Sequence, residues 1–319
     1  MLQTFDERNR DLIVNINGEL VHRDKAGISP FDSAVQGGDA VWEGLRLYEG
    51  KIFRLIEHLD RLRNSAKALA FAEIPSAEEF IEEIRRTLKA NEMTDGVHIR
   101  LTLTRGVKIT SGMDPRLNQS GPTLIVLAEF KPPVYRKSGL TFITASVRRF
   151  PPDCLDPNIH HANLIQSILA KIEANVAGAD QALMLDRQGF IAEAHGTHVF
   201  FVDGNTVFTS TTEACPEGIT RQTVLDLCAA NDVACEVRNI SLTAAYCADE
   251  MFCTGTMGEL VAVTTLDGRT IGSGQMGPIT RLLSDFYANE TATAGFSILE
   301  KHTELQSAKP GWRDRNSAG

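Results

Sequence analysis

The stretch Gly218-Ile-Thr-Arg-Gln-Thr-Val224 leads from a loop into a helix predicted over residues 220–230. Thr220 is predicted to cap this helix, so that the amides of Ile219 and Thr220 point outward from its first turn. Free amide hydrogens and the helix dipole at such an end attract anions, phosphate groups among them. Many helices begin in this way, so the stretch indicates a phosphate site only in combination with other signals.

A second signal is Glu250-Met-Phe-Cys-Thr-Gly-Thr-Met-Gly258, where a predicted strand runs into a turn of small residues with two hydroxyl groups. Such a turn is able to close on the same phosphate through its hydroxyl and amide groups. The alternative is an ordinary tight turn between two strands.

A third signal is a carboxylate within an apolar strand. Glu193 interrupts the strand predicted over residues 190–202. A buried carboxylate needs a strong partner, and the ring nitrogen of a bound pyridinium is one, because the carboxylate keeps that nitrogen protonated. The alternative is a glutamate on the solvent-exposed face of the strand.

The first 130 residues predict a sheet built from hairpins, with two helices. Asn17-Gly18 between apolar runs favours a tight hairpin, because both turn positions need a positive φ. Ser76 and Glu79 predict a capping box at the start of a helix. The other predicted elements are a hairpin across residues 45–55, a helix over 56–70, strands over 97–105 and 123–130, and a polar binding loop over 107–121.

Residues 131–139 predict a boundary, because their two prolines exclude both a helix and a central strand. We therefore expect an N-terminal domain over residues 1–130, a linker over 131–139 and a C-terminal domain over 140–319. Strands and helices interleave without a strict βαβ order, which favours an α+β fold with mixed sheets. The C-terminal domain is predicted to contain helices over 163–176, 220–230 and 277–288, strands over 140–147, 182–186, 190–202, 206–209, 236–242 and 250–253, and a weakly ordered tail after 301.

Composition excludes several classes of function. The formal charge of -9 disfavours non-specific binding to nucleic acid or to anionic membranes, and no apolar run is long enough to span a membrane. The first residues lack the apolar core of a signal peptide. The six cysteines form no Cys-x-x-Cys pair, so we expect reduced thiols in a cytoplasmic protein and no zinc site built on them.

Together with Trp42-Glu-Gly-Leu-Arg46, Phe53-Arg-Leu-Ile-Glu-His-Leu-Asp-Arg-Leu62 and residues 163–186, the three signals resemble the class IV aminotransferases of the branched-chain and D-amino-acid kind. The matching stretches cover nearly the whole chain in the same order. The resemblance implies a two-domain α+β fold with pyridoxal phosphate between the domains, and a homodimer. It also implies transfer of an amino group between a small amino acid and a 2-oxo acid, most like the branched-chain kind.

The resemblance also assigns residues. Glu193 matches the carboxylate that faces the pyridine nitrogen. Arg100 falls where branched-chain members keep an arginine on the substrate side, and Gly37 where the family often places an aromatic residue. The residues that match the phosphate contacts are Arg54, Ile219, Thr220 and Thr256.

The pattern breaks at the lysine that carries the cofactor covalently in the family. Its position, within Asn158-Ile-His-His-Ala-Asn163, is occupied by His160. An imidazole does not form this covalent link, so we expect pyridoxal phosphate to be held without a tether. Lys171 lies about three turns into the next helix, too far along to replace the lysine. Leu164 and His198 also depart from the family's tyrosine and asparagine, which reshapes the pocket.

Three interpretations follow. In the first, the protein is an aminotransferase-like enzyme in which His160 moves protons at Cα of the substrate and C4′ of the cofactor. In the second, it is a non-catalytic binder of pyridoxal phosphate or a metabolite, or a lyase with the same cofactor. In the third, four histidines bind a metal with Glu193. We favour the first, and expect no metal, because His-x-x-His on a strand points its rings to opposite faces. The four histidines are His160, His161, His195 and His198.

Overall fold

The computed structural model describes residues 3–132 and 138–300, which form two compact units. The N-terminal unit contains residues 4–132, 159–163 and 294–300, and the C-terminal unit contains residues 138–158 and 164–293 together with residue 3. The expected division within residues 131–139 therefore misses two segments, because residues 159–163 and 294–300 pack with the N-terminal strands. Residues 133–137 of the predicted linker and the predicted tail after 301 lie outside the described residues.

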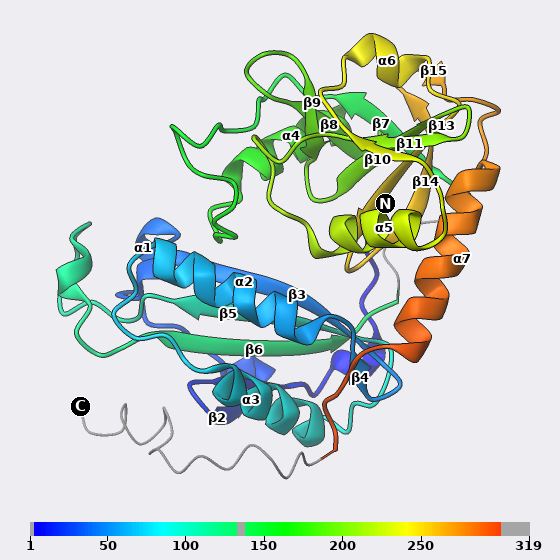
Figure 1. Ribbon diagram of the computed structural model, residues 1–319. Helices are drawn as coiled ribbons and strands as arrows, with labels where there is room; N and C mark the ends of the chain where they lie inside the picture. Colours follow the sequence, from blue (N-terminus) through cyan, green and yellow to red (C-terminus); the bar gives the residue numbers. More distant parts are fainter. Residues whose placement is uncertain (1–2, 133–137, 301–319) are drawn as a thin grey trace. The chain divides into compact units, whose positions relative to one another are not determined.

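The N-terminal unit is organised by a seven-stranded antiparallel sheet (Figure 1). Both predicted hairpins are confirmed: their turns, Asn17-Gly18 and Glu49-Gly50, have positive φ at both positions. The strands are β1 (Ile13–Ile16), β2 (Glu19–His22), β3 (Ala40–Tyr48), β4 (Lys51–Ile52), β5 (Val97–Thr104), β6 (Thr123–Phe130) and β16 (Phe296–Ser297). Their order across the sheet is β16-β4-β3-β5-β6-β1-β2.

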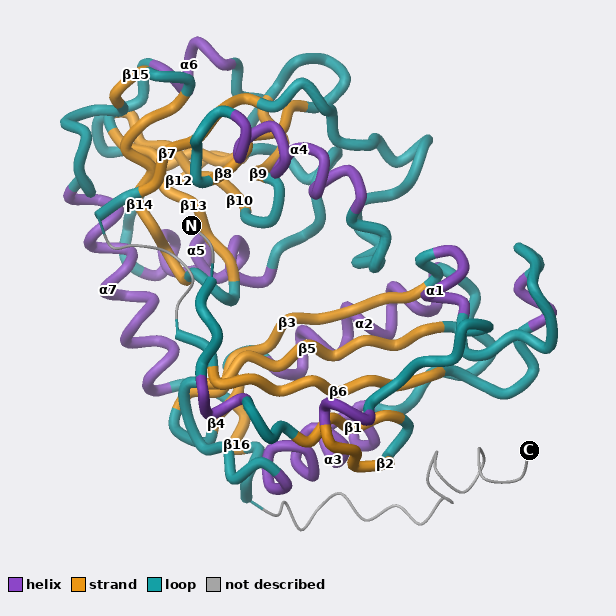
Figure 2. Tube along the Cα trace, turned by 180° about the vertical axis from the view of Figure 1, so that it is seen from behind, coloured by secondary structure: helices purple, strands orange, loops and turns teal. Residues whose placement is uncertain are grey.

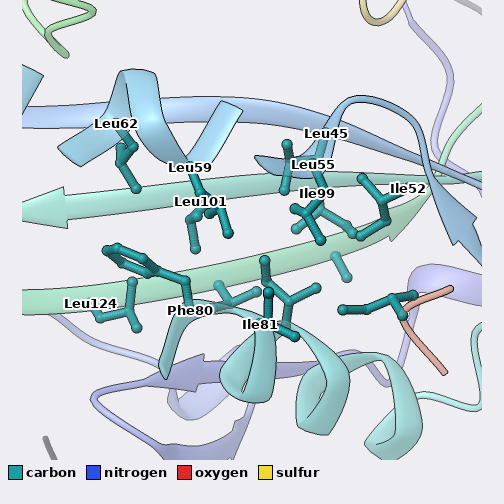
Figure 3. Close-up of a cluster of buried hydrophobic side chains, with 14 of the residues drawn as sticks. Leu45, Ile52, Leu55, Leu59, Leu62, Phe80, Ile81, Ile99, Leu101 and Leu124 are labelled. Carbon is teal, nitrogen blue, oxygen red and sulfur yellow. The ribbon is translucent and has the colours of Figure 1, made fainter. Parts of the chain in front are cut away.

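Two long helices cover one face of this sheet. Helix α2 (Leu55–Ala68) packs against β3, and α3 (Ala77–Ala90) packs against β6. The capping box predicted for α3 is confirmed, because Ser76 and Glu79 exchange backbone and side-chain hydrogen bonds. Figure 3 shows the core between helices and strands, with Leu59 of α2 and Phe80 of α3 among fully buried side chains. The unit also contains α1 (Ser33–Gly37) and 3-10 turns at Glu7–Asn9, Arg23–Lys25 and Pro115–Leu117.

The C-terminal unit contains a nine-stranded sheet, whose strands are orange in Figure 2. Parallel and antiparallel pairs are mixed in it, as predicted. Its strands are β7 (Leu140–Thr144), β8 (Gln181–Leu185), β9 (Ile191–Ala194), β10 (His198–Asp203), β11 (Thr206–Thr209), β12 (Cys235–Val237), β13 (Glu250–Gly255), β14 (Glu259–Leu266) and β15 (Arg269–Thr270). Its helices are α4 (Ile165–Val176), α5 (Ile219–Ala230), α6 (Leu242–Tyr246) and α7 (Pro278–Thr293). The order is β12-β11-β10-β13-β14-β7-β8-β9, with β15 paired to β14.

Two strand predictions in this unit are wrong. The strand predicted over residues 190–202 is two strands, because the chain turns at Gly196 and the amide of Ala194 bonds to the carbonyl of Thr197. The strand predicted over residues 236–242 ends at Val237, and α6 begins at Leu242. Among the described residues, no helix combines the length and apolar character needed to cross a membrane.

The core of the N-terminal unit gives a direct stability test. Leu59→Ala removes a fully buried side chain of α2 and is expected to lower the free energy of unfolding by about 2–5 kcal/mol. Ile56→Ala is the matched control on the same helix, because Ile56 is 42% exposed, and it should change stability by less than about 0.5 kcal/mol. Urea unfolding followed by circular dichroism measures both, and equal midpoints would contradict this core.

Candidate active site

Glu193 lies on β9, a strand whose four residues are all buried. This burial excludes the alternative of a glutamate on a solvent-exposed face. Its charge is paired inside the unit, because Nη2 of Arg149 lies 2.5 Å from Oε1 of Glu193. Such an ion pair offsets the cost of burying the carboxylate. Arg149 was not singled out from the sequence, since it follows β7 in a loop without a motif of its own.

His198 links Glu193 to the start of α5. Its Nε2 lies 3.8 Å from Oε2 of Glu193 and donates a hydrogen bond of 2.8 Å to the carbonyl of Pro216. The ring also packs directly on Gly218, where an added Cβ would lie 2.3 Å from the ring carbon Cε1. A side chain at position 218 would therefore displace His198, so this close approach requires glycine.

Helix α5 begins with its first amides open. Gly218 is the residue before the first helical turn, and no side chain of the described residues caps this end. The prediction that Thr220 caps the helix is wrong, because Thr220 is already inside it and buried. The amides of Ile219 and Thr220 have no intrahelical acceptor, as in the first turn of every helix. In the segments that the structure describes, no side chain caps this end, and its binding of an anion stays a prediction.

The turn after β13 lies next to His198. In the register of β10 and β13, His198 is opposite Thr254. The hydroxyl of Thr254 is buried and has no hydrogen-bond partner in the described part of the chain. Thr256 follows in the turn and is half-buried. The C-terminal unit thus gathers, around one histidine, a buried carboxylate, an uncapped helix start and the end of strand β13, where a threonine hydroxyl is unsatisfied.

The N-terminal unit contains a second buried carboxylate, Glu43 of β3. Nδ1 of His58 lies 2.6 Å from its Oε2, and Arg61 donates two hydrogen bonds of 2.7 Å, one to each carboxylate oxygen. Burial opposes ionisation of Glu43, but His160, Arg61 and His58 outweigh it and hold the pKa of this carboxyl well below its usual range. This cluster was missed, although a glutamate among the buried apolar residues of a strand is the same signal that identified Glu193.

His160 lies at the edge of β3, within the segment 159–163. The amide of Trp42 donates to the carbonyl of His160, and the amide of His160 donates to Oγ of Ser65. Nδ1 of His160 lies 2.5 Å from the carbonyl oxygen of Trp42 and 3.4 Å from Oε1 of Glu43. The imidazole stacks on the Trp42 ring, with centroids 4.5 Å apart. His160 therefore lies beside a buried carboxylate, and its correspondence to the family's lysine stays a prediction.

The other predicted site residues of this unit are Arg54, Arg100 and Gly37. Arg54 precedes α2 with a φ of 52°, a strained conformation for a residue with a side chain, and pairs with Glu57 at 3.0 Å. Its contact with the same phosphate as α5 stays a prediction. Arg100 stacks on Trp42 at 3.5 Å, and burial lowers its pKa to about 10. Gly37 ends α1 in open space, and the substrate roles of Arg100 and Gly37 stay predictions.

The interpretation that histidines bind a metal with Glu193 needs several metal-ligating side chains close together. Within residues 3–132 and 138–300, no group of three or more His, Cys, Asp or Glu side chains could hold a metal ion. His195 lies in the turn before β10 rather than on a strand, and burial together with Lys171 lowers its pKa to about 4. Nζ of Lys171 bonds to the carbonyl of Asp180 at 2.5 Å.

Comparison with known proteins identifies a family. Residues 40–266 match the family described as amino-transferase class IV. The chain is 50% identical over 303 residues to branched-chain-amino-acid aminotransferase-like protein 2 of Arabidopsis thaliana, covering 95% of this chain but 54% of that protein. It therefore spans about half the length of that relative. It is 38% identical over 290 residues to a putative branched-chain-amino-acid aminotransferase of Methanocaldococcus jannaschii, covering 90% of this chain and 99% of the other.

A solved structure agrees in fold. The T.th. branched-chain amino acid aminotransferase, complexed with N-(5'-phosphopyridoxyl)-L-glutamate, is 33% identical, with a TM-score of 0.83 and coverage of 89% of this chain and 95% of that one. The expected α+β fold and the resemblance noted in the sequence are thereby confirmed. The matched stretch contains Glu43, His160, Glu193 and the start of α5. This chain belongs to the class IV aminotransferase family.

Proposed function

We propose that this protein binds pyridoxal phosphate without a covalent tether and acts as an aminotransferase on a small amino acid and a 2-oxo acid, nearest to the branched-chain kind. The observation that carries the proposal is that, in the C-terminal unit, His198 contacts both the buried carboxylate Glu193 and the start of α5. Glu193 approaches one side of this ring, and the uncapped start of α5 lies against it. A carboxylate and an anion-binding helix end suit the pyridine nitrogen and the phosphate of one small molecule.

The residues of this unit fit the cofactor chemically. The amides of Ile219 and Thr220 and the hydroxyl of Thr256 would hold the phosphate, and Glu193 would hold the proton on the pyridine nitrogen. Thr254 lies at the end of β13, just before this turn, and its buried hydroxyl has no partner among the described residues, so it is able to bond to a further polar ligand. When bound, pyridoxal phosphate supplies an electron-withdrawing ring for bond breaking at the substrate Cα.

His160 would move the proton at the substrate Cα. An imidazole is able to accept and donate a proton through its ring nitrogens. Arg54 would add a phosphate contact, since a guanidinium forms two parallel hydrogen bonds to such a group. Arg100 and the residues near Gly37 would contact the substrate. A cytoplasmic location is part of the same proposal, in keeping with six cysteines that are all free of disulfides.

Cofactor binding without a tether is tested by titration with pyridoxal phosphate, followed by borohydride reduction and peptide mapping. We expect saturable binding and no modified lysine. Glu193→Gln should weaken binding about 10- to 100-fold, the loss expected for a hydrogen bond to a charged group. Glu236→Gln, at an exposed glutamate on β12 of the same unit, is the control and should bind as the wild type does.

The outcomes separate the interpretations. A lysine modified in the native protein would overturn the tetherless site. If Glu193→Gln bound pyridoxal phosphate with unchanged affinity, the proposed contact between Glu193 and the pyridine nitrogen would be wrong. Amino transfer to a 2-oxo acid, followed by chromatography of the products, supports the aminotransferase, whereas elimination products would indicate a lyase and binding without turnover a non-catalytic protein.

We also propose that the protein is a homodimer whose interface includes α4. This helix packs on its own unit through the small residues Ala170 and Ala174. Its charged side chains form hydrogen bonds within the unit: Lys171 donates to the carbonyl of Asp180, and Glu173 accepts from Ser146. The face that remains is uncharged and aliphatic, so it is complementary to itself across a two-fold axis. The exposed residues of this face are Ile165, Ile168, Leu169, Ile172 and Val176.

Light scattering after size-exclusion chromatography tests this interface. The wild type should have the mass of a dimer, and Ile168→Glu should shift it to a monomer, because burying an unpaired carboxylate at the interface is costly. Val237→Glu introduces the same charge at another exposed apolar residue of this unit and should leave the dimer intact. A monomeric wild type, or an Ile168→Glu dimer of unchanged stability, would contradict the proposal.

A further inference from the structure

The ring nitrogens of His160 have different surroundings. Nδ1 faces two oxygen acceptors, the carbonyl of Trp42 at 2.5 Å and Oε1 of Glu43 at 3.4 Å. A carbonyl oxygen only accepts hydrogen bonds, so the hydrogen of the neutral imidazole belongs on Nδ1. Nε2 is then the nitrogen with the lone pair, and it is the one able to take a proton.

The orientation of the ring is fixed from several directions. Trp42 stacks on it at an interplanar angle of 29°, while the backbone of His160 is bonded to Trp42 and Ser65. The side chain of Glu43 is fully buried, whereas that of His160 is 17% exposed. The carboxylate of Glu43 therefore lies deeper in the protein than the imidazole of His160, and solvent reaches the histidine but not the glutamate.

Glu43 has cationic and hydrogen-bonding partners on α2 besides its contact with His160. Arg61 binds both of its oxygens, and His58 contacts Oε2. These partners of α2 satisfy the buried carboxylate. The approach of Oε1 to His160 is thus an additional interaction, which stabilises the positive charge that the imidazole acquires when Nε2 takes a proton.

We propose that Glu43 is a positioning residue for His160, acting with the carbonyl of Trp42 to hold the hydrogen on Nδ1 and present Nε2 as the proton acceptor. A buried carboxylate behind an imidazole performs this task in hydrolases, where it sets the tautomer and stabilises the imidazolium. The proton transfer itself rests on the function proposed above, whereas the tautomer of His160 does not depend on the cofactor.

Nitrogen NMR of protein labelled with ¹⁵N-histidine tests the placement directly, without cofactor. His160→Gln assigns the signal. In the wild type, the neutral ring should show a protonated Nδ1 and an unprotonated Nε2. The opposite tautomer in the wild type would overturn the proposal, and this result needs no variant at position 43 to fold.

The second readout is exchange of the substrate α-hydrogen for deuterium, with pyridoxal phosphate and a branched-chain amino acid present. Glu43→Gln should slow exchange about 10- to 100-fold, the usual effect of losing a supporting carboxylate, with little change in KM. It should also raise the population of the Nε2-protonated tautomer. Glu43→Asp keeps the charge and should restore part of the rate.

Glu83→Gln is the matched structural control. Glu83 is also a buried glutamate of this unit, but it lies on α3 and is bonded to Asn15 and Arg86. This variant should lose stability but keep the wild-type tautomer and exchange rate. An equal loss of exchange in Glu43→Gln and Glu83→Gln, with an unchanged tautomer in both, would reduce Glu43 to a structural role. If the wild type showed the expected tautomer but did not exchange the substrate α-hydrogen, the proposed function would be contradicted. The proposal that Glu43 positions His160 would still stand.

Discussion

A carboxylate taken out of water costs several kcal/mol unless a cation meets it, and each unit of this protein contains a carboxylate of this kind near its candidate chemistry. Arg61 and His58 hold Glu43 beneath α2, while Arg149 holds Glu193 on β9. Each pair directs a negative charge toward a histidine, His160 in one unit and His198 in the other. The proposed role of His160 and the surroundings of His198 depend on these two buried charges.

A histidine in place of the family's lysine, as we propose for position 160, would change one part of this chemistry and leave others in place. A histidine at position 160 cannot hold the cofactor covalently, but it is able to exchange protons. The uncapped start of α5, the turn after β13 and Glu193 remain as a set suited to a phosphorylated pyridine. In the proposed site, these groups would bind the cofactor without a covalent bond, and His160 would exchange protons where the family has its tether.

Much of the fold could be predicted from local signals. Asn17-Gly18 and the Ser76 capping box act over a few residues, and both appear as expected. The segment 159–163 could not be placed, because its pairing with β3 joins residues far apart in the sequence and leaves no local pattern. The periodicity of α4 predicts a helix but not which face is buried, and the helix packs through its alanines. Glu43 was identifiable, since it is a carboxylate among the buried apolar residues of β3, as Glu193 is among those of β9.

The central claim is that position 160 is where the family's tether would attach and that the native protein lacks it. The most direct measurement is borohydride trapping of pyridoxal phosphate on two neighbouring variants, His160→Lys and His161→Lys, followed by peptide mapping. We expect a modified lysine at position 160, and none at position 161, whose backbone pairs with Val41. A folded His160→Lys protein that binds the cofactor but yields no adduct, or an adduct at position 161 alone, would contradict it.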